Sequence, residues 1–186
     1  VFRYGGKYYS GGGWTDSKAN LYIANSSASI SDSVFEYSYV YGAKLSNASS
    51  TLVGNIFRYN NNSAEGASAG LSSELGKLAL NSNIFSNNKR GLYVVSSNFD
   101  SSSSFNSNIF TSNTGEAVYS SGRLGSYSNN SGSSNGVNAI SVSGTITQNG
   151  ATTTLAANSL PYLLNGSVTV AAGSALAVNS GVVIKG

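Results

Sequence analysis

The sequence contains no cysteine and no histidine. Without cysteine the chain has no disulfide and no thiolate nucleophile, and without both residue types it lacks the usual ligands of zinc. The absence of histidine also removes the side chain that most often acts as a general base. Redox chemistry through thiols, the common zinc sites and histidine-based catalysis are therefore excluded.

Charged residues and proline are scarce. Only 9% of the 186 residues are charged, and ten basic against seven acidic side chains give a formal net charge of +3. Nucleic-acid binding needs a basic stripe along the phosphates, whereas the longest basic run here is Lys89-Arg90. The single proline, Pro161, leaves nearly every backbone N–H free for strand pairing. No apolar run approaches the ~20 residues of a membrane span, so we expect neither nucleic acid nor a span in this segment.

The chain opens with Val-Phe-Arg-Tyr, without an initiating methionine or a signal segment. We interpret it as a fragment of a longer protein that forms one domain over 1–186. Its parts are an aromatic and glycine-rich end at 1–41, coils with asparagine corners at 42–127, and Val/Gly-rich coils at 137–186. A cysteine-free chain rich in Ser, Asn and Thr suits an extracellular or cell-surface bacterial protein.

A six-residue pattern that ends in phenylalanine recurs along the chain. Leu52–Phe57 reads Leu-Val-Gly-Asn-Ile-Phe, and copies lie at 30–35, 80–85 and 105–110. The closing phenylalanines are 22, 28 and 25 residues apart, which are periods typical of a solenoid. A degenerate copy begins near Leu124, with Tyr127 in place of phenylalanine, and composition predicts a loop at 128–136.

Each repeat is followed by a polar corner and a second strand that a glycine introduces. These strands begin at Gly42, Gly91, Gly115 and Gly136, and apolar residues alternate along them. No segment carries an apolar helical period with caps. The pattern predicts an all-β fold, a parallel β-helix with three short strands per coil, about seven to eight coils and essentially no helix.

Asparagine occupies the fourth position of three repeats, at Asn55, Asn83 and Asn108. If Leu52, Phe57 and their equivalents point inward, this asparagine lies at a sharp corner, where it is expected to tolerate a left-handed backbone. Equivalent residues of successive coils stand one sheet spacing, ~4.8 Å, apart. We therefore predict an asparagine ladder along the axis that satisfies buried polar groups and begins at Asn55, because the first repeat has Ser33 there.

The Asn-Ile-Phe repeats, asparagine-rich corners and glycine-led strands resemble the right-handed, single-stranded parallel β-helices of secreted bacterial proteins, a group that includes the pectate-lyase-like folds. The ending from Gly166 to Gly173 and from Gly181 to Gly186 is similar to coils of large surface and adhesin-type proteins. The resemblance implies the fold over nearly the whole chain. It does not imply one function, since such repeats carry enzymes, adhesins and stalks.

Polysaccharide lyases and hydrolases on this fold are known for clustered carboxylates, often with calcium. No two of the seven acids here occupy the same or adjoining columns of neighbouring coils: Asp16, Asp32, Glu36, Glu65, Glu74, Asp100 and Glu116. Glu36 and Arg58 follow equivalent phenylalanines, which predicts a cross-strand ion pair. Glu116 lies either inward or, by the preferred interpretation, at a corner. We predict no catalytic residues, no metal site, no cofactor and no turnover of acidic polysaccharides.

Aromatic residues are concentrated near the start of the chain, where seven of the twelve tyrosines and the only tryptophan lie in the first 41 residues. Aromatic rings offer an apolar face with a polar edge and can stack on sugars. The alternative is that these rings close the end of the solenoid. The candidate glycan or partner contacts are Tyr4, Tyr8, Tyr9, Trp14, Tyr37, Tyr39 and Tyr41.

An aliphatic residue precedes each closing phenylalanine, at Val34, Ile56, Ile84 and Ile109. Strand alternation turns these side chains outward if the phenylalanines face in, which would form an exposed stripe. Corner geometry or a covering loop near 60–79 would instead hide them. The sequence leaves both arrangements open.

We expect a non-catalytic structural or adhesive module of a bacterial surface protein, with polysaccharide, another surface protein or further copies of the chain as candidate partners. One alternative is the scaffold of a carbohydrate-active enzyme whose catalytic residues lie outside this segment. Another is a filament subunit that stacks end to end through strand edges.

Overall fold

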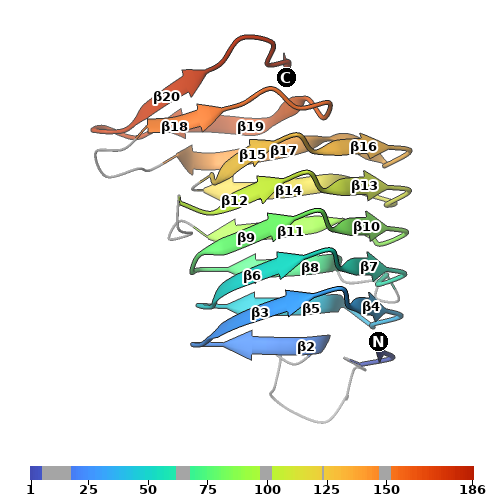
Figure 1. Cartoon of the computed structure of the whole chain (residues 1–186). Helices are drawn as coiled ribbons and strands as arrows, with labels where there is room; N and C mark the ends of the chain where they lie inside the picture. Colours follow the sequence, from blue (N-terminus) through green and yellow to red (C-terminus); the bar gives the residue numbers. More distant parts are fainter. Residues whose placement is uncertain (6–17, 62–67, 97–101, 123, 147–151) are drawn as a thin grey trace.

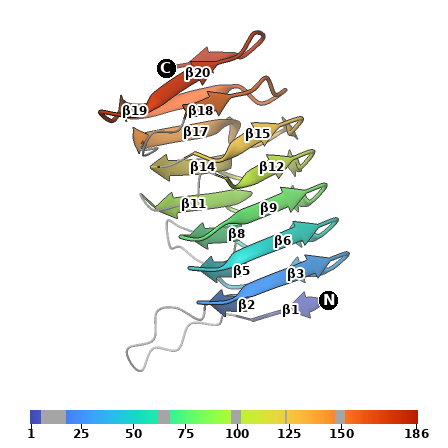
Figure 2. The same ribbon diagram turned by 60° about the vertical axis from the view of Figure 1, so that its left-hand side comes forward.

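The computed structural model describes residues 1–5, 18–61, 68–96, 102–122, 124–146 and 152–186. Within these ranges the chain forms β-strands and no helix, and the strand pairs are parallel. Figures 1 and 2 show the strands stacked in layers, with the two termini at opposite ends of the stack. The fold is a parallel β-solenoid of about 7 turns, which confirms the predicted architecture.

Three sheets run along the solenoid, and each regular coil passes through the eight-stranded, the five-stranded and then the six-stranded sheet. The eight-stranded sheet contains β2 (Ala19–Ala24), β5 (Tyr41–Ser46), β8 (Ala69–Glu74), β11 (Leu92–Ser96), β14 (Glu116–Gly122), β17 (Val137–Ile146), β19 (Tyr162–Val170) and β21 (Ile184–Lys185). The five-stranded sheet contains β3 (Ser27–Ser31), β6 (Ser49–Val53), β9 (Leu78–Asn81), β12 (Ser104–Asn106) and β15 (Ser126–Ser128). The six-stranded sheet contains β1 (Phe2–Arg3), β4 (Val34–Glu36), β7 (Ile56–Arg58), β10 (Ile84–Ser86), β13 (Ile109–Thr111) and β16 (Ser131–Ser133). A further pair joins β18 (Thr152–Leu155) to β20 (Ala175–Val178).

The core consists of columns of like side chains, because the parallel register places equivalent residues one strand apart. In the six-stranded sheet Phe57 pairs with Phe35 and Phe85, and Phe85 pairs with Phe110. The ring centroids of neighbouring phenylalanines are 4.8–4.9 Å apart, and Phe35, Phe57, Phe85 and Phe110 are buried. The inward orientation predicted for these residues is confirmed.

The leading glycines of the eight-stranded sheet are required by close packing beside a corner. A Cβ on Gly42 would lie 2.5 Å from the carbonyl oxygen of Gly70 and 2.8 Å from the Asn60 amide nitrogen. Gly91 is equally confined, with the carbonyl oxygen of Ala117 at 2.5 Å from its Cβ position. Any larger residue at Gly42 would have to push adjacent coils apart.

The predicted asparagine ladder is present and longer than expected. The Asn55 amide nitrogen donates to Asn83 Oδ1 at 3.0 Å, and the same bond links Asn83 to Asn108. Two more bonds extend the ladder to Asn130 and Asn158. Its start is also as predicted, since the Ser33 backbone N–H donates to Asn55 Oδ1.

The left-handed residue at this corner is the one before the ladder asparagine, so the expected left-handed asparagine is wrong. Positive φ values occur at Gly54, Ser82 and Ser107, which precede Asn55, Asn83 and Asn108. The ladder amide must point inward to reach the next coil, and the preceding residue makes the sharp turn that aims it there.

A second ladder, not predicted, runs along the corner that follows the six-stranded sheet. Its members are Asn60, Asn88, Asn113 and Asn135, whose amide bonds along the axis are 2.8–3.1 Å long. From the coil of Asn55 to that of Asn130, side-chain amides therefore hold two corners of each coil.

The prediction for the coil near Tyr127 is wrong. Tyr127 pairs with Phe105 and so takes the opening position of the repeat, whereas Gly132 takes the closing position opposite Phe110. The loop predicted at 128–136 contains β16 and two ladder asparagines. Neighbouring coils impose this structure on a Ser/Gly-rich segment, and the Leu160 side chain fills the space above Gly132.

Aligning the second strands on their leading glycines is also wrong beyond β11. Leu92 pairs with Val118, and Val118 pairs with Ile140. The segment from Asn113 to Val118 is one residue longer than the equivalent segment from Asn88 to Leu92. The register between β14 and β17 also shifts near Glu116. Relative to β11, a count from glycine therefore misplaces β14 by two residues and β17 by three.

Candidate functional site

The most exposed aromatic group of the described residues is a column of three tyrosines, which we call the tyrosine corner. Tyr4, Tyr37 and Tyr59 directly follow β1, β4 and β7, and these residues are 72%, 37% and 39% exposed. The ring centroids are 5.4 Å apart from Tyr4 to Tyr37 and 5.2 Å from Tyr37 to Tyr59, with interplanar angles of 16° and 7°. The rings thus stack face to face along the solenoid axis.

The backbone of the tyrosine corner is left-handed, with φ values of 57°, 56° and 56°. Bulky residues rarely adopt this conformation, because Cβ comes close to the backbone. The same corner of later coils carries Asn87, Ser112 and Ser134, with equal φ values. Smaller residues can therefore form this turn. Tyrosine at the turn of three successive coils concentrates backbone strain at this surface.

A charged column, Arg3, Glu36 and Arg58, lies beside the tyrosine corner on the outer face of the six-stranded sheet. Arg58 Nε is 2.6 Å from Glu36 Oε2, and Arg3 pairs with the other carboxylate oxygen. The predicted Glu36–Arg58 ion pair is therefore confirmed. Glu36 is 1% exposed, whereas the Arg3 and Arg58 side chains are 54% and 41% exposed.

The two arginines hold the pKa of Glu36 below its ordinary value of 4.5. The hydrogen bond from Arg58 lowers this pKa most, burial opposes the shift, and the charges of Arg3 and Arg58 add to the lowering. Glu36 thus stays ionised near neutral pH and fixes both guanidinium groups. Three groups leave one net positive charge beside the tyrosines.

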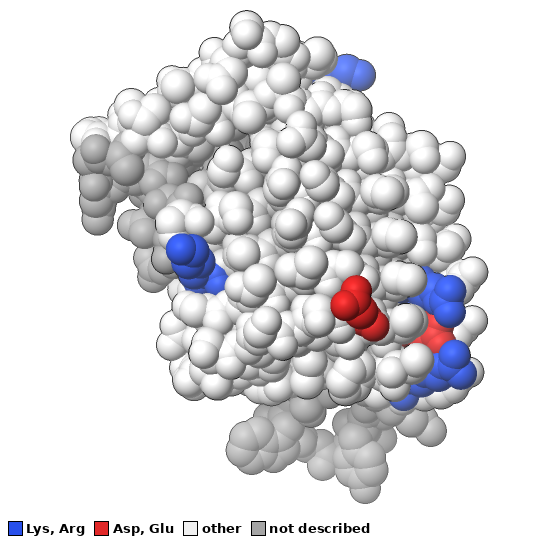
Figure 3. Space-filling view, in the orientation of Figure 1, with Lys and Arg blue, Asp and Glu red and all other residues white. Residues whose placement is uncertain are grey.

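Figure 3 shows how unusual this concentration of charge is. Most of the visible surface is uncharged, and basic and acidic side chains gather at the lower right, at the end of the molecule where Figure 1 places β1, β4 and β7. This group of charges therefore stands out on the face in view, where most other side chains are uncharged.

The structure divides the sequence-predicted aromatic residues. Tyr4 and Tyr37 belong to the tyrosine corner, whereas Tyr39 and Tyr41 are only partly exposed and lie outside it. The ammonium group of Lys44 is 5.9 Å from the centre of the Tyr41 ring. Tyr8, Tyr9 and Trp14 lie outside the described residues.

Tyr59 is part of the tyrosine corner but was not predicted. It follows Phe57 by two residues, as Tyr37 follows Phe35. The repeat itself contained that signal, because residues at equal distances from the closing phenylalanine occupy one column.

The aliphatic column on the six-stranded sheet faces outward. Val34 pairs with Ile56, and Ile84 pairs with both Ile56 and Ile109. Ile109 is 45% exposed, and the other three are partly exposed. The corner therefore does not tuck these residues into the core.

A second aromatic pair lies on the eight-stranded sheet, where Tyr93 stacks on Tyr119 at 5.3 Å. The Arg90 guanidinium lies 5.2 and 5.5 Å from the two ring centres, and its Nε is 2.7 Å from Glu116 Oε2. Glu116 is therefore at the start of β14 in an ion pair, as the corner interpretation predicted, and the inward alternative is wrong. These side chains are largely engaged with one another.

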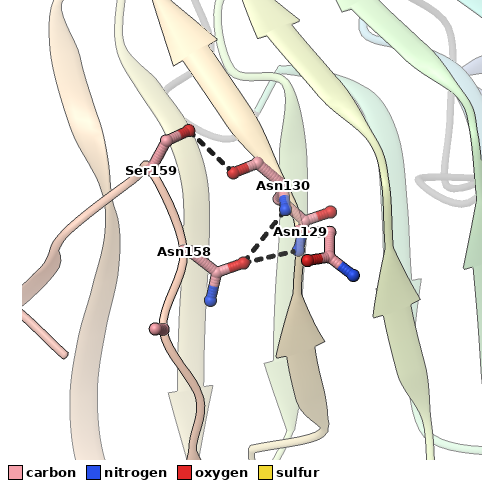
Figure 4. A pocket seen from close by; sticks show the side chains of 5 residues that line it. Asn129, Asn130, Asn158 and Ser159 are labelled. Atoms are coloured by element: carbon pink, nitrogen blue, oxygen red, sulfur yellow. Dashed lines mark hydrogen bonds between the residues drawn. The ribbon is translucent and has the colours of Figure 1, made fainter. Parts of the chain in front are cut away.

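A surface hollow at the C-terminal end of the first ladder is lined by polar side chains (Figure 4). Asn158 Oδ1 accepts from the Asn130 backbone N–H and amide nitrogen, and Ser159 Oγ donates to the Asn130 carbonyl oxygen. The polar groups of this hollow are thus used by the corner itself.

Among the residues that the structure describes, no three acidic side chains group as a metal site would require, and no helix could cross a membrane. No protein-family model, curated protein or solved structure matches the chain.

Proposed function

We propose that this chain is a non-catalytic structural and adhesive module of a bacterial extracellular surface protein, which contacts carbohydrate through the tyrosine corner and the charged column. The single observation that carries the proposal is the stack of Tyr4, Tyr37 and Tyr59 in strained backbone positions beside two half-exposed arginines. The fold does not require tyrosine at these strained positions, which suggests that the three side chains serve a binding contact.

The rest of the described structure supports a rigid support more than a catalyst. Buried phenylalanine columns and two amide ladders run along the axis. Three of the four described acids, Glu36, Glu74 and Glu116, pair with Arg58, Lys44 and Arg90 respectively. Polysaccharide hydrolysis needs a pair of free carboxyl groups at the bond to be cleaved, and these acids are otherwise engaged.

The stacking geometry changes the expected mode of contact. Both faces of Tyr37 are covered by its neighbours, so a sugar ring could stack only on the outer faces of Tyr4 and Tyr59, at the two ends of the column. The other rings present edges and hydroxyl groups, repeated once per coil beside Arg3 and Arg58. A regularly repeating polysaccharide that lies along the axis would meet this repeated set of hydrogen-bond donors.

The test replaces tyrosine by a residue that the same corner already accepts. Because Asn87 occupies the equivalent position with the same φ, the double variant Tyr37→Asn, Tyr59→Asn should keep the fold. We expect it to lose binding to insoluble polysaccharides, measured by pull-down, by at least tenfold at an unchanged melting temperature.

The matched control is Tyr22→Ser, which removes an exposed tyrosine from the eight-stranded sheet. This variant should bind polysaccharide like the parent. Equal binding by the double variant, or no binding of any glycan by the parent protein, would leave only the structural role.

A further inference from the structure

The tyrosine corner carries a second chemical possibility that does not depend on carbohydrate binding. Tyr37 and Tyr59 are held by the parallel register of β4 and β7, in which Glu36 pairs with Arg58. Their ring centres are 5.2 Å apart, and each side chain is more than one third exposed. Two phenols are therefore fixed next to each other with their ring edges open to solvent.

We propose that the tyrosine corner is an oxidative cross-linking site, at which Tyr37 is joined to a stacked neighbour by a carbon–carbon bond. The required oxidant is a peroxide acting through a peroxidase. One electron and one proton leave each phenol, and together they reduce hydrogen peroxide to two water molecules. The two phenoxyl radicals couple at ring carbons next to the oxygen, and the displaced ring hydrogens return to the oxygens. The product keeps both phenols and lacks two hydrogen atoms.

Proximity makes coupling within the molecule favourable. A tyrosyl radical on Tyr37 has a partner ring on each side, because Tyr4 and Tyr59 stack on its two faces. Such fixed neighbours act as a very high local concentration of the second reactant. For coupling, two exposed rings rotate out of the stack so that their edges meet.

The bond would be a covalent cross-link between coils, which this chain cannot form through a disulfide. The sequence contains no cysteine, and within the described ranges the two residues of β1 pair only with β4. A Tyr37–Tyr59 bond joins consecutive coils across 22 residues, and a Tyr4–Tyr37 bond would fasten the end of β1. Cross-links of this kind stabilise mainly by restricting the unfolded chain, as disulfides do.

The chain contains its own comparison in the Tyr93–Tyr119 stack. These rings are 5.3 Å apart, but they are half-buried, Arg90 lies over both, and the Tyr119 hydroxyl bonds to Ser143. The distance between ring centres is similar in the two stacks, whereas the exposure of the rings to solvent differs. The tyrosine corner should react first.

The experiment treats the 186-residue chain with horseradish peroxidase and hydrogen peroxide at a dilution that disfavours encounters between molecules. We expect dityrosine fluorescence, a monomeric band on a denaturing gel, and a peptide pair that joins Tyr37 to Tyr59 or Tyr4 with the loss of two hydrogen atoms. The cross-linked monomer should also melt at a higher temperature.

The variant Tyr37→Asn removes the central ring, and the expected result is at least a tenfold loss of intramolecular product. Tyr93→Ser is the control, since Ser72 and Ser141 occupy the same column of its sheet, and it should leave the yield unchanged. Products found only between molecules, or equal coupling of Tyr93 with Tyr119, would overturn the proposal.

Discussion

At the scale of the residue, the ladder asparagine is the best-defined feature of the solenoid. Asn83 Oδ1 accepts from both the backbone N–H and the amide nitrogen of Asn55. The Asn83 amide nitrogen donates to Leu52 O and to Asn108 Oδ1. One side chain thus links three coils, which needs a short group with both a donor and an acceptor. Aspartate would lack the donor, and aspartate in successive coils would place like charges one strand apart.

Replacing Asn83 with alanine should therefore destabilise the fold by roughly 1–3 kcal/mol, because buried partners on Asn55 and Leu52 lose their bonds. The measurement is urea unfolding. The control is Asn81→Ala, which removes an exposed amide two residues away and should change stability by only a few tenths of a kcal/mol. Equal effects of the two substitutions would show that the ladder is solvated.

At the scale of the element, the six-stranded sheet owes its stability to the phenylalanine column. Each of its regular strands has three residues, and only the middle one points into the core. Phe85 stacks on Phe57 and Phe110, each 4.9 Å away, and it is fully buried. Such short strands bury few other apolar side chains, so the stack is the main contribution of β4, β7, β10 and β13 to the core.

Phe85→Ala should cost ~3–5 kcal/mol, since it leaves a cavity between two rings that the backbone spacing keeps apart. Phe2→Ala should cost clearly less, because Phe2 is 39% exposed and, among the described residues, stacks on one ring, Phe35. Both values come from denaturant unfolding. A Phe85→Ala cost no larger than that of Phe2→Ala would contradict the column as the main support of the sheet.

At the scale of the whole molecule, the scarcity of ionisable groups determines how stability depends on pH. The chain has no histidine, so no side chain with an ordinary pKa titrates near pH 6.5. The acid side is governed by Glu36, whose pKa is lowered by Arg58 and Arg3. The alkaline side is governed by buried tyrosines, since burial raises the pKa of Tyr162 to about 12 and that of Tyr127 still further.

We predict a broad plateau of the melting temperature with a fall on each side. Above pH 4.5 Glu36 is ionised in both states and its stabilisation is complete, and it is lost as pH falls through the lower folded pKa. Above pH 10.0 the unfolded chain ionises its tyrosines first, so stability decreases as pH rises toward 12.

Glu36→Gln is the informative variant for the acid side. It should melt lower than the parent on the plateau, and this difference should shrink as pH falls below 4.5. A parent protein whose melting temperature changes steeply around neutral pH, or a Glu36→Gln difference that is constant in acid, would refute the assignment.

Much of this arrangement was determined by the sequence alone, because it depends on local period and on neighbours one repeat apart. The inward phenylalanines, the all-β parallel coils, the first ladder from Asn55 and the Glu36–Arg58 pair all follow from counting along one repeat. Alternation of side chains and a constant axial spacing suffice for such features.

The tertiary structure decided the features that depend on corner length and on what a neighbouring coil supplies. Composition predicted a loop at 128–136. In the structure this segment pairs with an adjacent strand, packs against the Leu160 side chain, and forms β16 and two ladder corners. An extra corner residue moved the register of β14, and only stacking showed that Tyr59 joins Tyr4 and Tyr37. The length of a corner cannot be read from its amino-acid composition. Residues that contact one another across coils are therefore identified only from the folded structure.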